Sequence, residues 1–260
     1  MKLPIYQVDA FTTRLFRGNP AAVVVLDSWL PDEVLQSIAA ENNLAETAYV
    51  IPGADPRPLR WFTPTIEIDL CGHATLATAH VLFRHHFPKL DRVSFQTKSG
   101  TLSVARDGNV LSMDFPSRPA RPVTVNDALT GALGAKPLEA LLARDLLAVF
   151  ESEDQVRGLQ PDFPRIAQLE GMAVIASAPG DQVDFVSRFF APKAGVPEDP
   201  VTGSSHCTLI PYWARRLGKT SLSARQISPR GGELRCELRG DRVRIGGAAV
   251  EYLEGEIEVG

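Results

Sequence analysis

Glu46 is the side chain whose position most clearly suggests chemistry. It follows the segment Asn42-Asn43-Leu44-Ala45 and directly precedes the apolar run 47–51. That pattern predicts a buried strand with Glu46 at its entrance. A carboxylate there could act as a general acid or base, but a solvated residue at the end of a strand explains the same position. The residue itself leaves both interpretations open.

Further polar residues lie in a segment that the chain contains twice. The first copy begins with Arg60-Trp61-Phe62-Thr63-Pro64 and ends on Cys71-Gly72-His73, with Glu67 four residues before Cys71. The second begins with Arg188-Phe189-Phe190-Ala191-Pro192 and ends on Thr202-Gly203-Ser204, with Glu198 four residues before Thr202. The copies are separated by close to half of the 260 residues. A repeat with that period predicts a duplicated domain.

An apolar run follows the glycine of each copy and predicts a buried helix there. The run after Gly72 is small and apolar on all sides, and a helix without a polar face belongs inside a structure. A helix N-terminus presents unpaired amide groups and about half a positive charge, which attract carboxylates. Gly72 and Gly203 could instead only permit tight turns. Their duplication with polar neighbours favours two anion-binding helix ends that face each other across a cleft.

The two copies differ where a racemase would require a match. A two-base racemase needs a proton acceptor on each face of the stereocentre, but the paired positions hold Cys71 and Thr202. A threonine hydroxyl is a poor base and cannot mirror a thiolate. This favours Glu46 as both base and acid. Aligning Ala48-Tyr49-Val50 with Ala173-Val174-Ile175 places Gly171 opposite Glu46, so the carboxylate is expected in one half only.

Asp199 and His73 lie beside the two expected helix starts. Asp199 precedes Thr202 by three residues, where it could cap the helix or accept a hydrogen bond from a substrate amine or hydroxyl. The spacing does not separate these two roles. The helix dipole disfavours a protonated His73, so we expect a neutral imidazole that donates or shuttles a proton.

Metal and cofactor chemistry receive little support from the sequence. Cys71, His73, His206 and Cys207 form two Cys/His pairs, but their spacings match no usual zinc pattern. Nicotinamide, flavin and nucleotide cofactors have no anchor, because the chain lacks a helix-opening GxGxxG and a GxxxxGK[ST] loop. No GxSxG hydrolase motif is present either. We therefore expect neither a metal nor a cofactor.

The composition is that of an ordinary globular protein, with 44% apolar and 22% charged residues. A net charge of −4 gives no electrostatic reason to bind nucleic acid or an anionic membrane. Three cysteines argue against a disulfide framework. The N-terminus alternates like a strand rather than a signal peptide, and no run approaches the roughly 20 apolar residues that span a bilayer. These features predict a cytoplasmic protein.

Most of the chain is expected to form strands, with one buried helix in each half. Three prolines in 116–122 mark a linker, which predicts domains at 1–117 and 118–260, with the last strand near 248–260 packing back on the first. Strands are expected at 5–10, 21–26, 46–51, 60–62, 92–96, 101–106, 110–115, 146–150, 172–176, 184–190, 222–227, 233–239 and 242–245. Helices are expected at 31–42, from 72, at 126–133, at 163–170 and from near 203.

Five segments together resemble the PhzF (phenazine biosynthesis-like) family. They are Asp9-Ala10-Phe11, Gly18-Asn19-Pro20-Ala21-Ala22-Val23-Val24, Asn43-Leu44-Ala45-Glu46-Thr47, Cys71-Gly72-His73-Ala74-Thr75 and Glu198-Asp199-Pro200-Val201-Thr202-Gly203-Ser204. The resemblance implies an α/β (α+β) fold similar to diaminopimelate epimerase. Such a fold has two pseudo-repeated domains, each a mixed β-sheet or barrel wrapped around a central buried helix. It also implies a homodimer.

The same resemblance implies a cofactor-free isomerase that moves a proton within a small carboxylate-bearing metabolite. Glu46 matches the family's proton-shuttling glutamate, while His73 and Asp199 match its assisting acid/base and substrate-orienting residues. The residues expected to hold the substrate are Asn19, Cys71, Gly72, Gly203 and Ser204. Two alternatives are kept: a non-catalytic binding protein that retained the fold, and a two-base epimerase.

Overall fold

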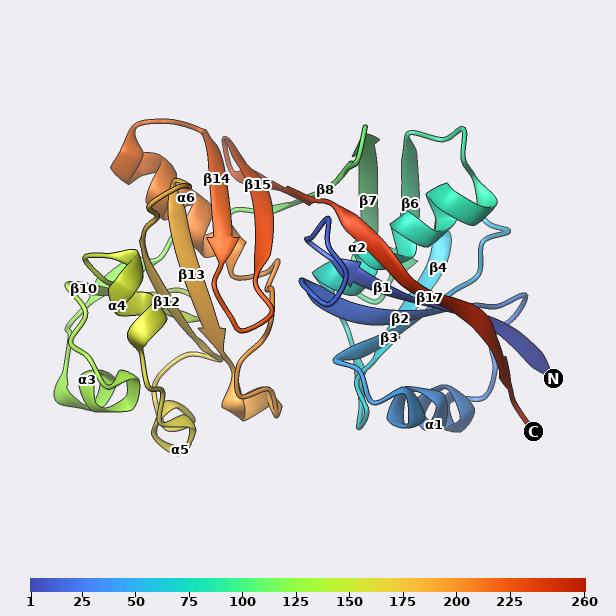
Figure 1. Cartoon of the computed structure of the whole chain (residues 1–260), viewed down its shortest axis with the longest axis horizontal. Helices are drawn as coiled ribbons and strands as arrows, with labels where there is room; N and C mark the ends of the chain where they lie inside the picture. The colour runs from blue at the N-terminus through green and yellow to red at the C-terminus, as the bar shows by residue number, and fades with distance from the viewer. The chain divides into compact units, whose positions relative to one another are not determined.

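Two units that repeat one arrangement make up the chain (Figure 1). The structure is a computed structural model that describes residues 1–260. Unit 1 comprises Met1–Asp114 together with Gly246–Gly260, and unit 2 comprises Phe115–Ile245. Both combine a mixed sheet with one central buried helix, which is the fold class that the sequence predicts.

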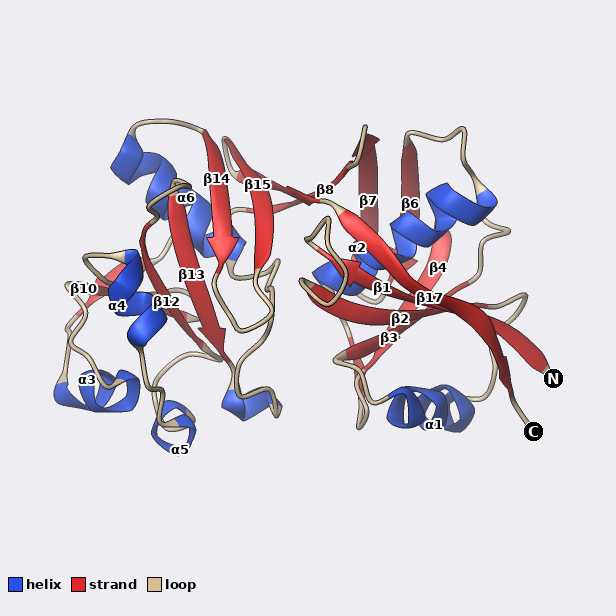
Figure 2. Ribbon diagram, viewed as in Figure 1, coloured by secondary structure: helices blue, strands red, loops and turns tan.

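Unit 1 encloses helix α2 (Gly72–Val81) with strands, as Figure 2 shows. A second helix, α1 (Asp32–Asn42), packs on β3 and β4, and a π-helical turn, Leu82–His86, follows α2. The strands are β1 (Lys2–Ala10), β2 (Asn19–Val25), β3 (Glu46–Val50), β4 (Arg57–Phe62), β5 (Glu67–Ile68), β6 (Arg92–Thr97), β7 (Gly100–Asp107), β8 (Val110–Pro116) and β17 (Ala249–Glu258).

Helix α2 is buried, and its two threonine hydroxyls are satisfied within the helix. Eight of its ten residues are buried, and most of these are alanine, leucine or valine. The hydroxyl of Thr75 donates to the Cys71 carbonyl at 2.5 Å, and that of Thr78 donates to the Ala74 carbonyl at 2.7 Å. Internal bonds of this kind remove the cost of placing a hydroxyl in an apolar core.

Strand pairing brings the C-terminal strand back to the N-terminus. β1 lies between β2 and β17 and is antiparallel to both, with Ala10 opposite Ala249 and Lys2 opposite Glu258. The last strand therefore packs on β1 of unit 1. β2 and β3 are parallel, and β3 and β4 are antiparallel.

Unit 2 repeats this order of pairing. β11 is parallel to β12, which is antiparallel to β13. Its central helix α6 (His206–Leu217) buries Trp213, whose indole Nε1 donates to Ser177 Oγ at 2.9 Å. The other elements are β9 (Arg121–Val123), α3 (Asp127–Leu133), β10 (Glu139–Leu142), β11 (Leu146–Val149), α4 (Glu153–Gly158), α5 (Phe163–Ile166), β12 (Val174–Pro179), β13 (Phe185–Phe190), a 3-10 turn (Pro192–Ala194), β14 (Ser221–Gln226), β15 (Gly232–Arg239) and β16 (Arg242–Gly247).

The differences from the expected elements are local. α6 begins at His206 rather than near Gly203, because 203–205 first form a turn. α5 ends at Ile166 instead of residue 170. The sequence patterns missed β5, β9, β10 and α4, whose two to six residues are too few to show a periodicity. None of the helices is both long and apolar enough to cross a membrane.

Gly18 and Gly108 offer a matched test of the turn that leads into β2. Both have a left-handed backbone, with φ of 67° and 57°, but a Cβ on Gly18 would lie 2.1 Å from the Ala10 carbonyl oxygen while one on Gly108 would meet nothing within 4 Å. We expect Gly108→Ala to lower the free energy of unfolding by about 1 kcal/mol, which is the cost of the backbone strain alone. Gly18→Ala should lower it by roughly 3 kcal/mol or more, because a steric clash adds to the same strain. Urea denaturation measures both, and equal losses would contradict the clash.

Candidate active site

Glu46 and His73 form the centre of the candidate site in unit 1. Glu46 is the first residue of β3, and His73 is the second residue of α2. Glu46 Oε2 lies 3.0 Å from His73 Nε2, and the two side chains are only 15% and 7% exposed. The distance is that of an ion pair, although neither atom is aligned as in a directed hydrogen bond.

The other ring nitrogen of His73 faces two more of the expected site residues. His73 Nδ1 lies 3.2 Å from Asn19 Nδ2 and 3.5 Å from Cys71 Sγ. Asn19 is fully buried at the start of β2, and the parallel register of β2 and β3 pairs Ala21 with Glu46, which brings both strand starts to one end of the sheet. The fold therefore gathers Asn19, Glu46, Cys71 and His73 around the first turn of α2.

The electrostatics of the cluster favour a protonated His73 over the expected neutral imidazole. Burial lowers the pKa of His73, but the neighbouring acidic groups of Cys71 and Glu46 outweigh it, and the pKa lies well above its usual range. Burial raises the pKa of the Cys71 thiol most, and the negative charge of Glu46 raises it further. This thiol is therefore neutral near pH 7. Because the Cys71 thiol is neutral near pH 7, the Glu46 carboxylate is the charged neighbour that favours a protonated His73 there.

Glu46, Cys71 and His73 also meet the distance condition for a metal site, since their ligand atoms all lie within 4.8 Å of one another. Two of these atoms already form an ion pair with each other. The third belongs to a thiol with a raised pKa, whereas metals bind the thiolate. The donor set is therefore better suited to proton transfer than to holding a cation.

The repeated arginine and glutamate make the same contact in both units. In unit 1, Arg60 Nε and Nη2 lie 2.8 and 2.9 Å from the two carboxylate oxygens of Glu67. In unit 2, Arg188 makes the same forked contact with Glu198 at 2.7 and 2.9 Å. All four side chains are less than one-fifth exposed. Each pair fixes the loop between a strand and the following helix start, where the candidate residues lie.

A similar internal contact is found at the start of each central helix. Thr75 donates its hydroxyl to the Cys71 carbonyl, and His206 Nδ1 lies 2.8 Å from the Thr202 carbonyl, so each tie spans four residues. Because a carbonyl only accepts, His206 Nδ1 carries the hydrogen. Burial lowers the pKa of His206 to about 4, so the ring is neutral. His206 is therefore a structural group at the start of α6.

Strand register corrects the alignment of the two halves. Thr47 pairs with Phe62 in unit 1, and Val174 pairs with Phe190 in unit 2. The position equivalent to Glu46 is consequently Ala173, two residues from the predicted Gly171. Alanine also lacks a carboxylate, so the chemical asymmetry between the halves remains.

Asp199 does not cap α6, so the interpretation of Asp199 as a helix cap is wrong. The helix begins at His206 with Ser205 as its N-cap, well beyond Asp199. The hydroxyl of Thr202 donates to Asp199 Oδ2, and Gln226 Nε2 donates to the Asp199 carbonyl at 2.7 Å. Gln226 Oε1 also accepts from the Thr202 amide at 2.9 Å. These contacts hold the segment from Asp199 to Thr202 in one conformation, with the carboxylate partly exposed.

Arg144 is a neighbour of the site that sequence reasoning missed. It lies in the turn between β10 and β11, and its Nη2 lies 3.1 Å from Ser204 Oγ, just after Gly203. An arginine in a turn carries no sequence signal that links it to a residue sixty positions later. The contact places a fixed positive charge beside two of the expected substrate-holding residues.

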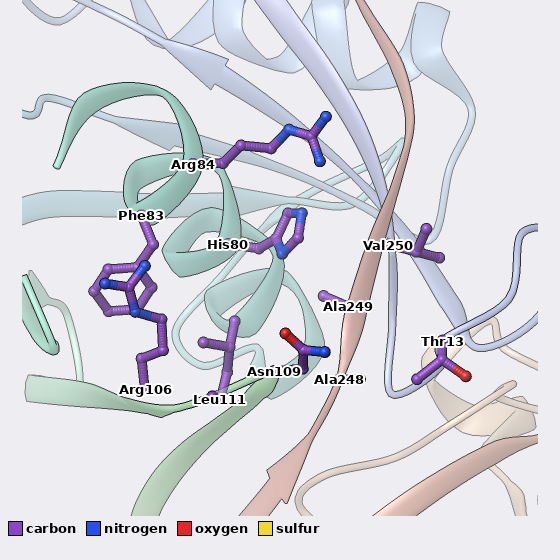
Figure 3. Close-up of a pocket in the computed structure, with 11 residues that line it drawn as sticks. Thr13, His80, Phe83, Arg84, Arg106, Asn109, Leu111, Ala248, Ala249 and Val250 are labelled. Atoms are coloured by element: carbon purple, nitrogen blue, oxygen red, sulfur yellow. The ribbon is translucent and has the colours of Figure 1, made fainter. Parts of the chain in front are cut away.

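A cavity of about 370 Å³ lies elsewhere in unit 1, between the second half of α2 and the start of β17 (Figure 3). Its lining includes His80, Arg106 and Asn109, with Arg106 lying over the ring of Phe83. None of Asn19, Glu46, Cys71 or His73 lines it. The cavity is therefore separate from the candidate site.

Comparison with known proteins gives consistent results. Residues 8–255 match the model of a family described as "Phenazine biosynthesis-like protein". A Pseudomonas aeruginosa protein named as an uncharacterized isomerase is 52% identical over 260 residues, covering 100% of both chains. A crystal structure of a PhzF-family phenazine biosynthesis protein from Enterococcus faecalis has a TM-score of 0.98 and 49% identity, covering 100% of both chains. A hydroxyproline epimerase from Agrobacterium vitis, 11% identical with a TM-score of 0.61 over 98% of this chain and 92% of its own, shares the fold. These likenesses confirm the predicted epimerase-like fold.

The neutral state of His206 predicts how stability depends on pH. An unfolded histidine titrates near 6.5, whereas the folded pKa of His206 is about 4. A lowered folded pKa means that its contribution is complete above pH 6.5 and is lost as the pH falls, because only the unfolded chain takes up the proton. We expect about 3 kcal/mol of unfolding free energy to be lost over this window.

Urea unfolding at a series of pH values measures this loss. His206→Asn keeps a donor for the Thr202 carbonyl but cannot titrate, so its stability should depend less steeply on pH between 6.5 and 4. Parallel pH curves for the wild type and His206→Asn would show that the assignment is wrong.

Proposed function

Because the chain belongs to the phenazine biosynthesis-like protein family, we propose that it is an isomerase that moves a proton within a small carboxylate-bearing metabolite without a cofactor. One observation carries the proposal: the Glu46 carboxylate lies 3.0 Å from His73, and both side chains are largely but not completely buried. Relatives named as isomerases from Pseudomonas aeruginosa and Halalkalibacterium halodurans support the reaction class.

Glu46 is the proposed proton carrier. Its carboxylate takes a proton from one carbon of the substrate, the double bond shifts, and the resulting carboxylic acid returns the proton to another carbon. The reaction needs no oxidant, reductant or second substrate. A carboxylate acting as base and then as acid needs a neighbour that adjusts to both states, and His73 is that neighbour. Its positive charge pairs with the Glu46 carboxylate before proton abstraction, and its N–H can stabilise negative charge on the substrate afterwards.

Candidate substrate-binding groups are assigned within each unit. The amides at the start of α2, from Gly72, and at Gly203–Ser204 are proposed to bind the substrate's carboxylate. Asp199 is proposed to accept a hydrogen bond from a substrate amine or hydroxyl, since Thr202 already holds its carboxylate in place. Asn19 and Cys71 are proposed to act through His73, because both contact its Nδ1. A cytoplasmic homodimer is part of the same proposal.

A two-base epimerase fits the observed groups less well. The Thr202 hydroxyl donates to Asp199, so it is not poised to take a proton from carbon. The Cys71 thiol has a raised pKa, which makes it a weak base at neutral pH. A binding protein without activity would need neither the buried Glu46–His73 pair nor the fixed Asp199. No observation favours either alternative over the isomerase.

Solvent deuterium exchange tests the proposal. A thermal-shift screen of carboxylate metabolites supplies a ligand, and proton NMR in D₂O follows its turnover. Glu46→Gln preserves the shape of the side chain but removes the base, so we expect exchange to fall roughly 10²–10⁴-fold while binding is retained. Exposed Glu41 provides a matched control, and Glu41→Gln should exchange at the wild-type rate. Unchanged exchange in Glu46→Gln would remove Glu46 from this role, and a wild-type protein that binds ligands but never exchanges a proton would favour the binding protein.

A further inference from the structure

The cavity beside the second half of α2 has the size and the apolar surface of a small-molecule site. Its volume is about 370 Å³, and ligand pockets in proteins begin at roughly 300 Å³. Phe83, Leu111 and Val250 contribute apolar side chains to its lining. Every residue of the lining belongs to unit 1, so the cavity is complete within that unit.

His80 brings an unsatisfied polar atom to this cavity. Its side chain projects from α2 towards Ala249 of β17, as Figure 3 shows. His80 Nε2 is shielded from solvent and has no hydrogen-bond partner in the protein. Such an atom is costly in a folded protein, and a ligand group inside the cavity is a partner that would satisfy it. Burial, the largest influence, lowers the pKa of His80, so its ring is neutral near pH 7 and can donate one hydrogen bond.

Arg84 and Asn109 add further hydrogen-bond donors to the same cavity. Arg84 follows His80 by four residues, a spacing that places both side chains on one face of a helix. It also projects towards β17 (Figure 3). Its Nε lies 3.4 Å from Glu251, but its side chain is 60% exposed, so the outer nitrogens can turn to a ligand. Asn109 contributes an amide from the turn between β7 and β8.

The charges of the lining favour an anion over a cation. Two arginines line the cavity, and no acidic side chain does. The second, Arg106, is held in place, because its Nη2 donates to the Pro88 carbonyl at 2.8 Å and its guanidinium lies 4.8 Å from the centre of the Phe83 ring. The carboxylates that pair with the two arginines, Glu251 and Asp91, lie outside the lining. A negative group in the cavity therefore meets donors and positive charge.

We propose that this cavity binds a small organic acid, whose carboxylate accepts hydrogen bonds from His80, Arg84 and Asn109 and whose apolar body lies against the hydrophobic lining. Guanidinium groups donate strong, charge-assisted hydrogen bonds to carboxylates. The site is a second one, separate from Glu46 and His73, and it does not depend on the proposed isomerase activity. A cavity that is only a packing defect filled with water would bind no such acid saturably.

The test is an NMR titration of the ¹⁵N-labelled protein with sodium benzoate, using benzyl alcohol as the uncharged ligand of similar shape. We expect the amide resonances of Gly108, Asn109 and Ala249 to shift saturably with benzoate and much less with benzyl alcohol. Arg84→Gln should raise the apparent Kd for benzoate about tenfold, as expected for a lost charge-assisted hydrogen bond. Arg92 is exposed and lies outside the lining, so Arg92→Gln is the control variant and should bind as the wild type does.

A cavity-filling substitution provides an independent variant. The Cβ of Ala249 points from β17 towards α2 (Figure 3), so Ala249→Leu should occupy the cavity and abolish the benzoate shifts at Gly108 and Asn109. Circular dichroism verifies that this variant folds, and Arg84→Gln decides the question if it does not.

Three outcomes would overturn the proposal: no saturable shift at these amides, equal shifts with benzyl alcohol, or the same Kd in Arg84→Gln and Arg92→Gln. Benzoate that shifts only the amides of Gly72 and Ser204 has bound at the candidate active site, which also overturns it. The titration needs no turnover, and Glu46→Gln should bind benzoate in this cavity as the wild type does. Failure of the proton-transfer scheme is therefore distinguishable from failure of this proposal.

Discussion

The forked Arg–Glu pair that precedes each central helix is the constraint on which the candidate site depends. Burial alone does not fix the rotation or axial position of a central helix, because dispersion and burial are not directional. Arg60 with Glu67 and Arg188 with Glu198 supply that direction, since a bidentate contact fixes both distance and angle. The ties from Thr75 and His206 to the carbonyls at the helix starts complete the restraint. The duplicated Arg–Glu pairs are therefore structural, whereas the side chains that could carry a proton differ between the copies.

The two units therefore differ in the chemical groups at their helix and strand starts. At the helix start, Cys71 and His73 in unit 1 correspond to Thr202 and Ser204 in unit 2, and at the strand start Glu46 corresponds to Ala173. Unit 1 thus holds the groups that can carry a proton. Unit 2 holds hydroxyls, Asp199 and Arg144, which can orient and bind a charged molecule. In the proposed isomerase a single carboxylate and its histidine perform both proton transfers.

Much of this arrangement could be predicted from the sequence, and the failures have physical causes. Apolar runs and turn residues locate most strands, the buried helices and the return of β17 to β1. The misalignment of Glu46 with Gly171 is a shift of two residues, which leaves the alternation of a strand unchanged and is invisible to a pattern with that period. Asp199 was compatible with a helix cap because spacing alone does not show that 203–205 form a turn before α6. The charge of His73 and the role of Arg144 depend on partners that only the tertiary fold brings near.

The most direct test of the account is the titration of His73 itself, followed by NMR of the protein labelled at the histidine ring. The account predicts that His73 remains protonated well above pH 6.5 in the wild type, because Glu46 lies 3.0 Å away. In Glu46→Gln the carboxylate is gone and burial remains, so the pKa of His73 should fall below 6.5. A His73 that is neutral at pH 6.5 in the wild type, or whose titration is the same in both proteins, would contradict the central claim that Glu46 and His73 act as one coupled pair.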